Sequence, residues 1–133
     1  MLFRSAALYR QYDNALLLDA GDFLHGLPIA SLSQGQDIVS LMKTTGYFAV
    51  AVGNHDFNYG RDVLLKRADE ASLEPNPMHM LSANVRHKNG QNLLEPWVIT
   101  ELDGLKIGIF GLTTEETAFQ ATDRKSTRLN SSH

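Results

Sequence analysis

Two short polar segments contain the residue types that could do chemistry in this chain. Asp22 ends the segment DAGD at 19–22, and Asn54 and His55 lie in the segment GNHD at 53–56. A carboxylate and an amide carbonyl are oxygen ligands that hard divalent cations accept, and an imidazole can lie beside them. The two segments therefore predict a metal-dependent site.

The three residue types suit different roles in hydrolysis. In two-metal hydrolysis a carboxylate such as Asp22 can bridge two cations about 3.5 to 4 Å apart, which activate a bound water. Asn54 could bind one cation through its side-chain carbonyl, and His55 could face the substrate. A structural alternative stays open, because Asp also forms turns or caps helices and Asn often bonds its own backbone in a loop.

Buried strands are expected to position both segments. Apolar runs at 15–19 and 48–52 precede them, as in strands that are buried on both faces. The stretch 33–45 has helical spacing and stops at Gly46, a suitable C-terminal cap. A strand, a helix and a strand in this order predict a parallel unit, whose carboxyl ends border a crevice where ligands bind.

The remaining pattern predicts the rest of the fold. We expect a helix at 61–72, a third strand at 80–85 and a hairpin in which Asp103-Gly104 joins runs at 96–102 and 105–112. The predicted fold class is α/β, with mixed β-sheets sandwiched by helices and incomplete. Residues 1–122 are predicted to form one partial domain. Residues 123–133 are predicted to be a disordered tail, or an artefact that resembles a translated sequencing adapter.

Composition excludes several functional classes. The net charge of -3 gives no basic field for a nucleic acid polymer. The absence of cysteine excludes disulfides, thiolate zinc sites and cysteine nucleophiles. No apolar run approaches the roughly 18 residues of a membrane span. No oligomeric state is predicted.

The two segments, taken with their neighbours, resemble a known family. LLLDAGD at 16–22 and GNHDFNYG at 53–60, with 81–85 and 108–113, are similar to blocks of the calcineurin-like metallophosphoesterases, in the branch of bacterial 5′-nucleotidases. The resemblance implies an αββα fold in which Asp22 bridges two divalent metal ions such as Zn, Mn or Fe and Asn54 binds the second ion. His55 would stabilise charge on the phosphoryl group or assist the leaving group.

The same resemblance implies a biological setting. The substrate would be a small nucleotide, from which metal-activated water removes phosphate. The protein would be periplasmic, secreted or at the cell surface.

The chain departs from the family pattern at several places. The branch often has aspartate at the position of Asn58, and the substitution found in this chain is seen in relatives that act on cyclic nucleotides. A 2′,3′-cyclic nucleotide phosphodiesterase or a nucleotide-sugar hydrolase is therefore an alternative. The family's Asp-x-His and Gly-His-x-His blocks are absent, so the metal site is expected to be incomplete, and a catalytically silent truncated fragment is a further alternative. None of the remaining histidines fits those blocks: His25, His79, His87 and His133.

Three further polar residues have structural interpretations. Asp19 is expected to be a buried carboxylate satisfied by backbone donors. His25 is expected to be solvated or at the rim of a substrate site. Asn84 could either line such a rim or support the backbone.

Overall fold

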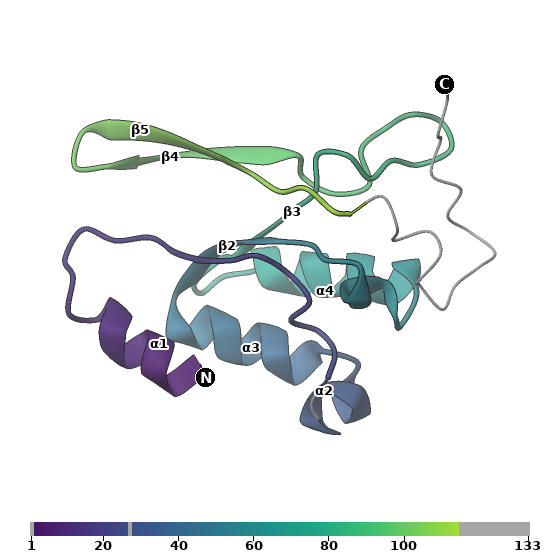
Figure 1. Cartoon of the computed structure of the whole chain (residues 1–133), viewed down its shortest axis with the longest axis horizontal. Coiled ribbons are helices and arrows are strands. Elements are labelled where there is room, and N and C mark those ends of the chain that lie inside the picture. The colour runs from purple at the N-terminus through teal and green to yellow at the C-terminus, as the bar shows by residue number, and fades with distance from the viewer. Residues whose placement is uncertain (1, 27, 115–133) are drawn as a thin grey trace.

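The strands form two separate sheets in the computed structural model, which describes residues 2–26 and 28–114. A parallel sheet has the strand order β1-β2-β3, and an antiparallel hairpin is formed by β4 and β5 (Figure 1). The strands are β1 (Leu17–Asp19), β2 (Tyr47–Ala51), β3 (His79–Leu81), β4 (Trp97–Leu102) and β5 (Leu105–Phe110). The predicted tail at 123–133 lies outside the described residues.

The helices gather on one side of the parallel sheet, and the hairpin lies on the other (Figure 1). Helix α3 packs against β2 and α4 packs against β3, while α1 and α2 contact α3. The helices are α1 (Leu2–Tyr9), α2 (Pro28–Ser33), α3 (Gln36–Thr45) and α4 (Arg61–Ser72), with a 3₁₀ turn η1 (His55–Phe57). The predicted α/β class is confirmed. No helix within the described part of the chain is long and apolar enough to cross a membrane.

The hydrophobic core fills the space between α3, α4 and the parallel sheet. Its fully buried members include Met42, Val50, Phe57 and Leu64. Burying a side chain of this size contributes about 1.5 to 3 kcal/mol. The core therefore fixes the sheet whose ends carry the polar segments.

The helix predicted at 33–45 is α3, which begins three residues later, at Gln36, and a separate helix that was not predicted, α2, ends at Ser33. Gln34 and Gly35 have left-handed φ values of 50° and 83°, which end α2 before α3 begins. A Cβ on Gly35 would lie 2.6 Å from a side-chain carbon of Leu24, so packing as well as φ favours glycine. The predicted cap is confirmed, because Gly46 has φ 100° and its N–H donates to the carbonyls of Met42 and Lys43.

The first strand is less covered than its apolar sequence predicts. β1 lies at the edge of the described sheet, and Leu18 is 46% exposed. Burial of this strand on both faces is therefore wrong for the described residues. An apolar run shows that the side chains of a strand can be buried. Whether they are buried depends on which segments from elsewhere in the chain pack against the strand.

The third strand is shorter than predicted because the chain changes partners after Leu81. The N–H of Ser82 donates to the carbonyl of Glu95 at 2.9 Å, and the N–H of Ala83 donates to the carbonyl of Gly111 at 2.8 Å. These bonds connect the parallel sheet to the segments that flank the hairpin.

The hairpin follows its sequence signal. Its register pairs Trp97 with Phe110 and Leu102 with Leu105. Asp103 and Gly104 have φ values of 56° and 77°, as a two-residue turn between twisted strands requires. One face of the hairpin presents the exposed side chains of Trp97, Ile99 and Phe110.

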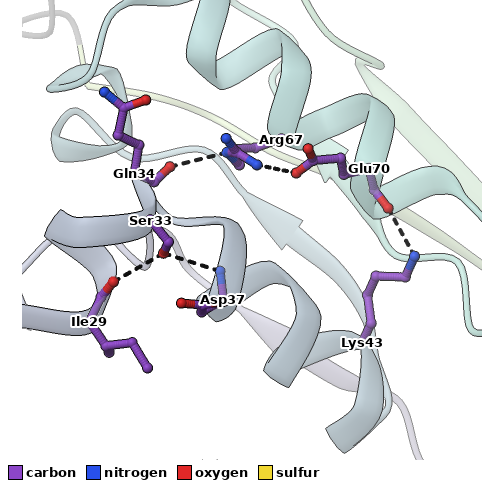
Figure 2. Close-up of polar contacts among 7 residues, drawn as sticks. All are labelled: Ile29, Ser33, Gln34, Asp37, Lys43, Arg67 and Glu70. Carbon is purple, nitrogen blue, oxygen red and sulfur yellow. Dashed lines mark hydrogen bonds and ion pairs between the residues drawn. The ribbon is translucent and has the colours of Figure 1, made fainter.

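A buried arginine ties α4 to the start of α3 (Figure 2). Arg67 is 4% exposed; its Nε donates to the carbonyl of Gln34 at 3.1 Å, and its Nη1 pairs with the carboxylate of Glu70. Lys43 of α3 donates through Nζ to the carbonyls of Glu70 and Leu73, at 2.9 and 2.7 Å. These carbonyls lie at the C-terminal end of α4, where the last carbonyls of a helix have no N–H donor within the helix.

Replacing Arg67 tests how much its hydrogen bond and ion pair stabilise the fold. Arg67→Met keeps most of the side-chain volume but leaves the Gln34 carbonyl and the Glu70 carboxylate without their donor. We expect the free energy of unfolding to fall by about 2 kcal/mol in a urea titration. Arg61→Met is the control, because Arg61 is paired with the exposed Asp62 and should change stability by less than about 0.5 kcal/mol. Equal losses in the two variants would contradict the prediction.

Candidate metal centre

The parallel pairing of β1 and β2 brings the two polar segments to one edge of the sheet. Asp19 is in register with Val50, so both strands end side by side. The backbone N–H of His55 donates to Oδ1 of Asp22 at 2.9 Å. The structure thus brings Asp22, Asn54 and His55 together, although 33 residues separate Asp22 from His55.

The two segments approach so closely that glycine is needed at their contact. A Cβ on Gly53 would lie 2.2 Å from Oδ1 and 2.7 Å from the backbone nitrogen of Asp22. A Cβ on Gly21 would lie 2.7 Å from the nitrogen of Gly53, and Gly21 has φ 111°. Asp22 itself has φ 62°, an uncommon conformation for a residue with a side chain.

A buried carboxylate, that of Asp56, accepts hydrogen bonds from both segments. Asp56 is 1% exposed, and its Oδ2 accepts the N–H of Asp22 at 2.9 Å and that of Gly53 at 2.9 Å. Its Oδ1 accepts the N–H of Leu24 at 2.8 Å. Sequence reasoning assigned no role to Asp56, because an aspartate in a polar loop gives no signal of which atoms it contacts.

The same burial affects the proton affinity of this carboxyl group. Burial disfavours the charged form and raises the pKa of Asp56 to about 6, while the hydrogen bonds from the three backbone N–H groups oppose the rise. At pH 7 the ionised form predominates, and this form accepts hydrogen bonds on both oxygens.

Two side chains contact the ring of His55, and a third contacts one of them. Nδ1 of His55 lies 3.2 Å from Nδ2 of Asn58. The ring of His25 stacks on that of His55, with centroids 5.9 Å apart and planes inclined by 16°, and Tyr59 lies 5.8 Å from His25. His25 is exposed and lies at the rim of the candidate site.

The donor set fits part of a metal site. Asp22 offers a carboxylate and Asn54 an amide carbonyl, both of them oxygen donors suited to divalent cations. Across 2–26 and 28–114, no group of three or more His, Cys, Asp or Glu side chains could hold a metal ion. His79 is occupied elsewhere, since its Nδ1 lies 2.8 Å from Oε2 of Glu95. Further ligands would be needed to complete a two-metal centre.

A second polar network supports the end of β2 next to Gly53. The hydroxyl of Thr113 donates to the carbonyl of Val52 at 2.6 Å and lies 2.9 Å from the hydroxyl of Ser82. Asn84 donates to the carbonyl of Thr113 at 2.6 Å and accepts its N–H at 2.9 Å. Asn84 therefore supports the backbone.

The half-buried Asp19 has a backbone donor, as predicted. Its Oδ1 accepts the N–H of Gly21 at 2.9 Å. The bond closes the turn that leads from β1 to Asp22.

Known proteins are similar to this chain in sequence and in fold. No family model matches the sequence. The chain is 40% identical over 106 residues to a 5′-nucleotidase of Vibrio parahaemolyticus, covering 79% of the chain and 18% of that protein. The calcineurin-like phosphoesterase YfkN from Bacillus subtilis has a TM-score of 0.77 at 27% identity, covering 94% of this chain and 43% of that one. The NAD nucleotidase NadN from Haemophilus influenzae has a TM-score of 0.70 at 32% identity, covering 88% and 20%.

The fold is that of the calcineurin-like phosphoesterases. Since the sequence matches agree with the structural ones, the chain belongs to the calcineurin-like metallophosphoesterases, in the 5′-nucleotidase branch. It spans about a fifth of the length of the curated relatives that it matches.

A methyl group at the contact between the loops should displace Asp22. Gly53→Ala places a Cβ against both the side chain and the backbone of Asp22, so the loop must shift and the bond from His55 to Asp22 is lost. We expect the free energy of unfolding to fall by about 1 to 3 kcal/mol, with a changed amide shift for His55 in NMR spectra. Gly108→Ala is the control, because no atom lies within 4 Å of its Cβ position. An unchanged His55 amide in Gly53→Ala would contradict the geometry.

Proposed function

We propose that this chain forms part of a metal-dependent phosphohydrolase that removes phosphate from small nucleotides. The observation that carries the proposal is the hydrogen bond from His55 N–H to Asp22, which brings a carboxylate, an amide and an imidazole to one sheet edge. Relatives named 5′-nucleotidase support the substrate class. Residues 1–122 would form the partial catalytic domain and 123–133 a tail outside it.

Each site residue has a proposed task. Two divalent ions, Zn, Mn, Fe or similar, would supply a water nucleophile at neutral pH and neutralise phosphoryl oxygens. Asp22 would hold both ions through its carboxylate, whose Oδ1 also accepts the N–H of His55. Asn54 would bind the second ion through a neutral carbonyl, which keeps the negative charge of the site low.

His55 would act on the substrate as the catalytic residue. An amide nitrogen of Asn58 that donates to Nδ1 leaves the ring proton on Nε2. Nε2–H could then donate a hydrogen bond to a phosphoryl oxygen or to the leaving oxygen. The family resemblance supports a periplasmic, secreted or cell-surface location.

The contact between Asn58 and His55 favours a second candidate substrate. A carboxylate at position 58 would accept a hydrogen bond from Nδ1–H and increase the basicity of the ring, whereas Asn58 has no negative charge with which to do so. A 2′,3′-cyclic nucleotide, or a nucleotide sugar, is therefore the alternative substrate within the same reaction class.

Substitution of the site residues tests the reaction. In the full-length enzyme that carries this segment, His55→Ala should lower kcat for a nucleotide by about 10² to 10⁴. Asp22→Ala and Asn54→Ala should raise the Mn²⁺ concentration needed for activity, because each removes a proposed ligand. His87→Ala is the control and should keep the wild-type rate, since His87 lies in a turn outside the site. Wild-type turnover in both Asn54→Ala and His55→Ala would refute the assignment.

The silent alternative needs its own assay. The 133-residue chain is incubated with a generic phosphomonoester and Mn²⁺. Turnover that Asp22→Ala abolishes would exclude a silent fragment. A folded chain without turnover would support it.

Changing Asn58 tests the choice between substrates. Asn58→Asp restores a carboxylate beside Nδ1 of His55, and we expect the ratio of kcat/KM for 5′-AMP over 2′,3′-cyclic AMP to rise by about tenfold. Asn89→Asp, in an exposed turn, is the matched control. An unchanged ratio in Asn58→Asp would remove the argument for the cyclic substrate.

A further inference from the structure

We propose that Asp56 is a positioning residue that sets the separation between the loops of Asp22 and Asn54. Its consequence for metal binding rests on the proposed function. Oδ2 of Asp56 accepts one N–H from each loop, from Asp22 and from Gly53, both at 2.9 Å. A single oxygen atom is thus shared between the two segments that carry the proposed ligands.

The geometry separates Asp56 from the metal ligands themselves. Both of its oxygens accept backbone N–H groups, and the side chain is 1% exposed. Moving this carboxylate toward a cation would leave three N–H groups without their acceptor, two of them shared by Oδ2. Asp56 therefore acts through the backbone, although it directly follows His55 in the sequence.

Only a carboxylate matches the three donors. An asparagine at this position presents one acceptor oxygen and one NH₂ group, which would face an N–H donor. Glutamate keeps both acceptor oxygens on a side chain that is one methylene longer. The two substitutions therefore separate acceptor chemistry from side-chain length.

Asp56 also supports the hydrogen bond between His55 and Asp22, in which it takes no part itself. By holding the N–H of Asp22, it supports the left-handed backbone of that residue, with φ 62°. This conformation directs Oδ1 of Asp22 to the N–H of His55. Loss of Asp56 should therefore expose the amide of His55 as well as the amides that Asp56 contacts.

Amide hydrogen exchange on the full chain, read by NMR, tests the inference. In Asp56→Asn, we expect the amides of Asp22, Gly53 and His55 to exchange about tenfold faster or more, while the amide of Leu64 in α4 changes by less than about threefold. Asp56→Glu should recover part of the protection. Arg67→Met is the matched control, because it removes a buried charged side chain whose partners, Gln34 and Glu70, lie outside both loops, and it should accelerate exchange evenly.

Several results would overturn the proposal. These are unchanged protection of Asp22 and His55 in Asp56→Asn, or an acceleration that is as large at Leu64 as in the loops. Should Asp56→Asn fail to fold, the wild-type chain decides, because amides of Asp22 and Gly53 that exchange as fast as open loops would also refute it. None of these measurements needs turnover, so a failure of the proposed function would appear separately, in the phosphatase assays.

In the full-length enzyme, the same variants give a second measurement. Asp56→Asn should raise the Mn²⁺ concentration for half-maximal activity by about tenfold, and Asp56→Glu should reverse part of that rise. Arg67→Met should lower thermal stability and leave the Mn²⁺ requirement unchanged. An equal Mn²⁺ requirement in wild type and Asp56→Asn would contradict the positioning role.

Discussion

The candidate site depends on the carboxylate of Asp56 and the three backbone N–H groups that it accepts. Its partners at Asp22 and Leu24 lie 34 and 32 residues away along the chain, and each bond to a charged acceptor is of a kind that contributes about 1.5 to 3 kcal/mol. Without these hydrogen bonds, the loops of Asp22 and Asn54 would lie close to each other while three of their backbone N–H groups had no acceptor. The glycines at the contact permit the approach, and Asp56 holds it.

The surrounding elements position this contact. The parallel pairing of β1 with β2 ends both strands at the same edge, and the core beneath them fixes the sheet against α3 and α4. Lys43 connects α3 to the end of α4, and Arg67 connects α4 to Gln34, just before α3 (Figure 2). The proposed catalytic and metal-binding residues thus lie in loops, and the helices and strands hold these loops in place.

Local patterns in the sequence predicted the elements that depend on local forces. Arg61–Ser72 is a helix with the predicted bounds, and the Asp103-Gly104 turn joins the hairpin as its residue types require. The residues proposed for the site were chosen from the sequence, because oxygen donors after apolar runs are a chemical signal. The structure places them together, as parallel strand ends should.

Features set by distant partners were not predictable. Gly35 separates α2 from α3 where the Leu24 side chain fills the space that a Cβ would need. Leu18 is exposed because β1 is the edge strand of the described sheet. Asp56 is the clearest case. A carboxylate in a polar loop is equally compatible with a cation and with backbone donors, and only the fold decides between them.

The bond from Thr113 to the Val52 carbonyl, which spans 61 residues, affects the order in which the chain folds. Contacts of such long range form late and slow folding, so a chain emerging from the ribosome completes the frame of this site only after residue 113 has been synthesised.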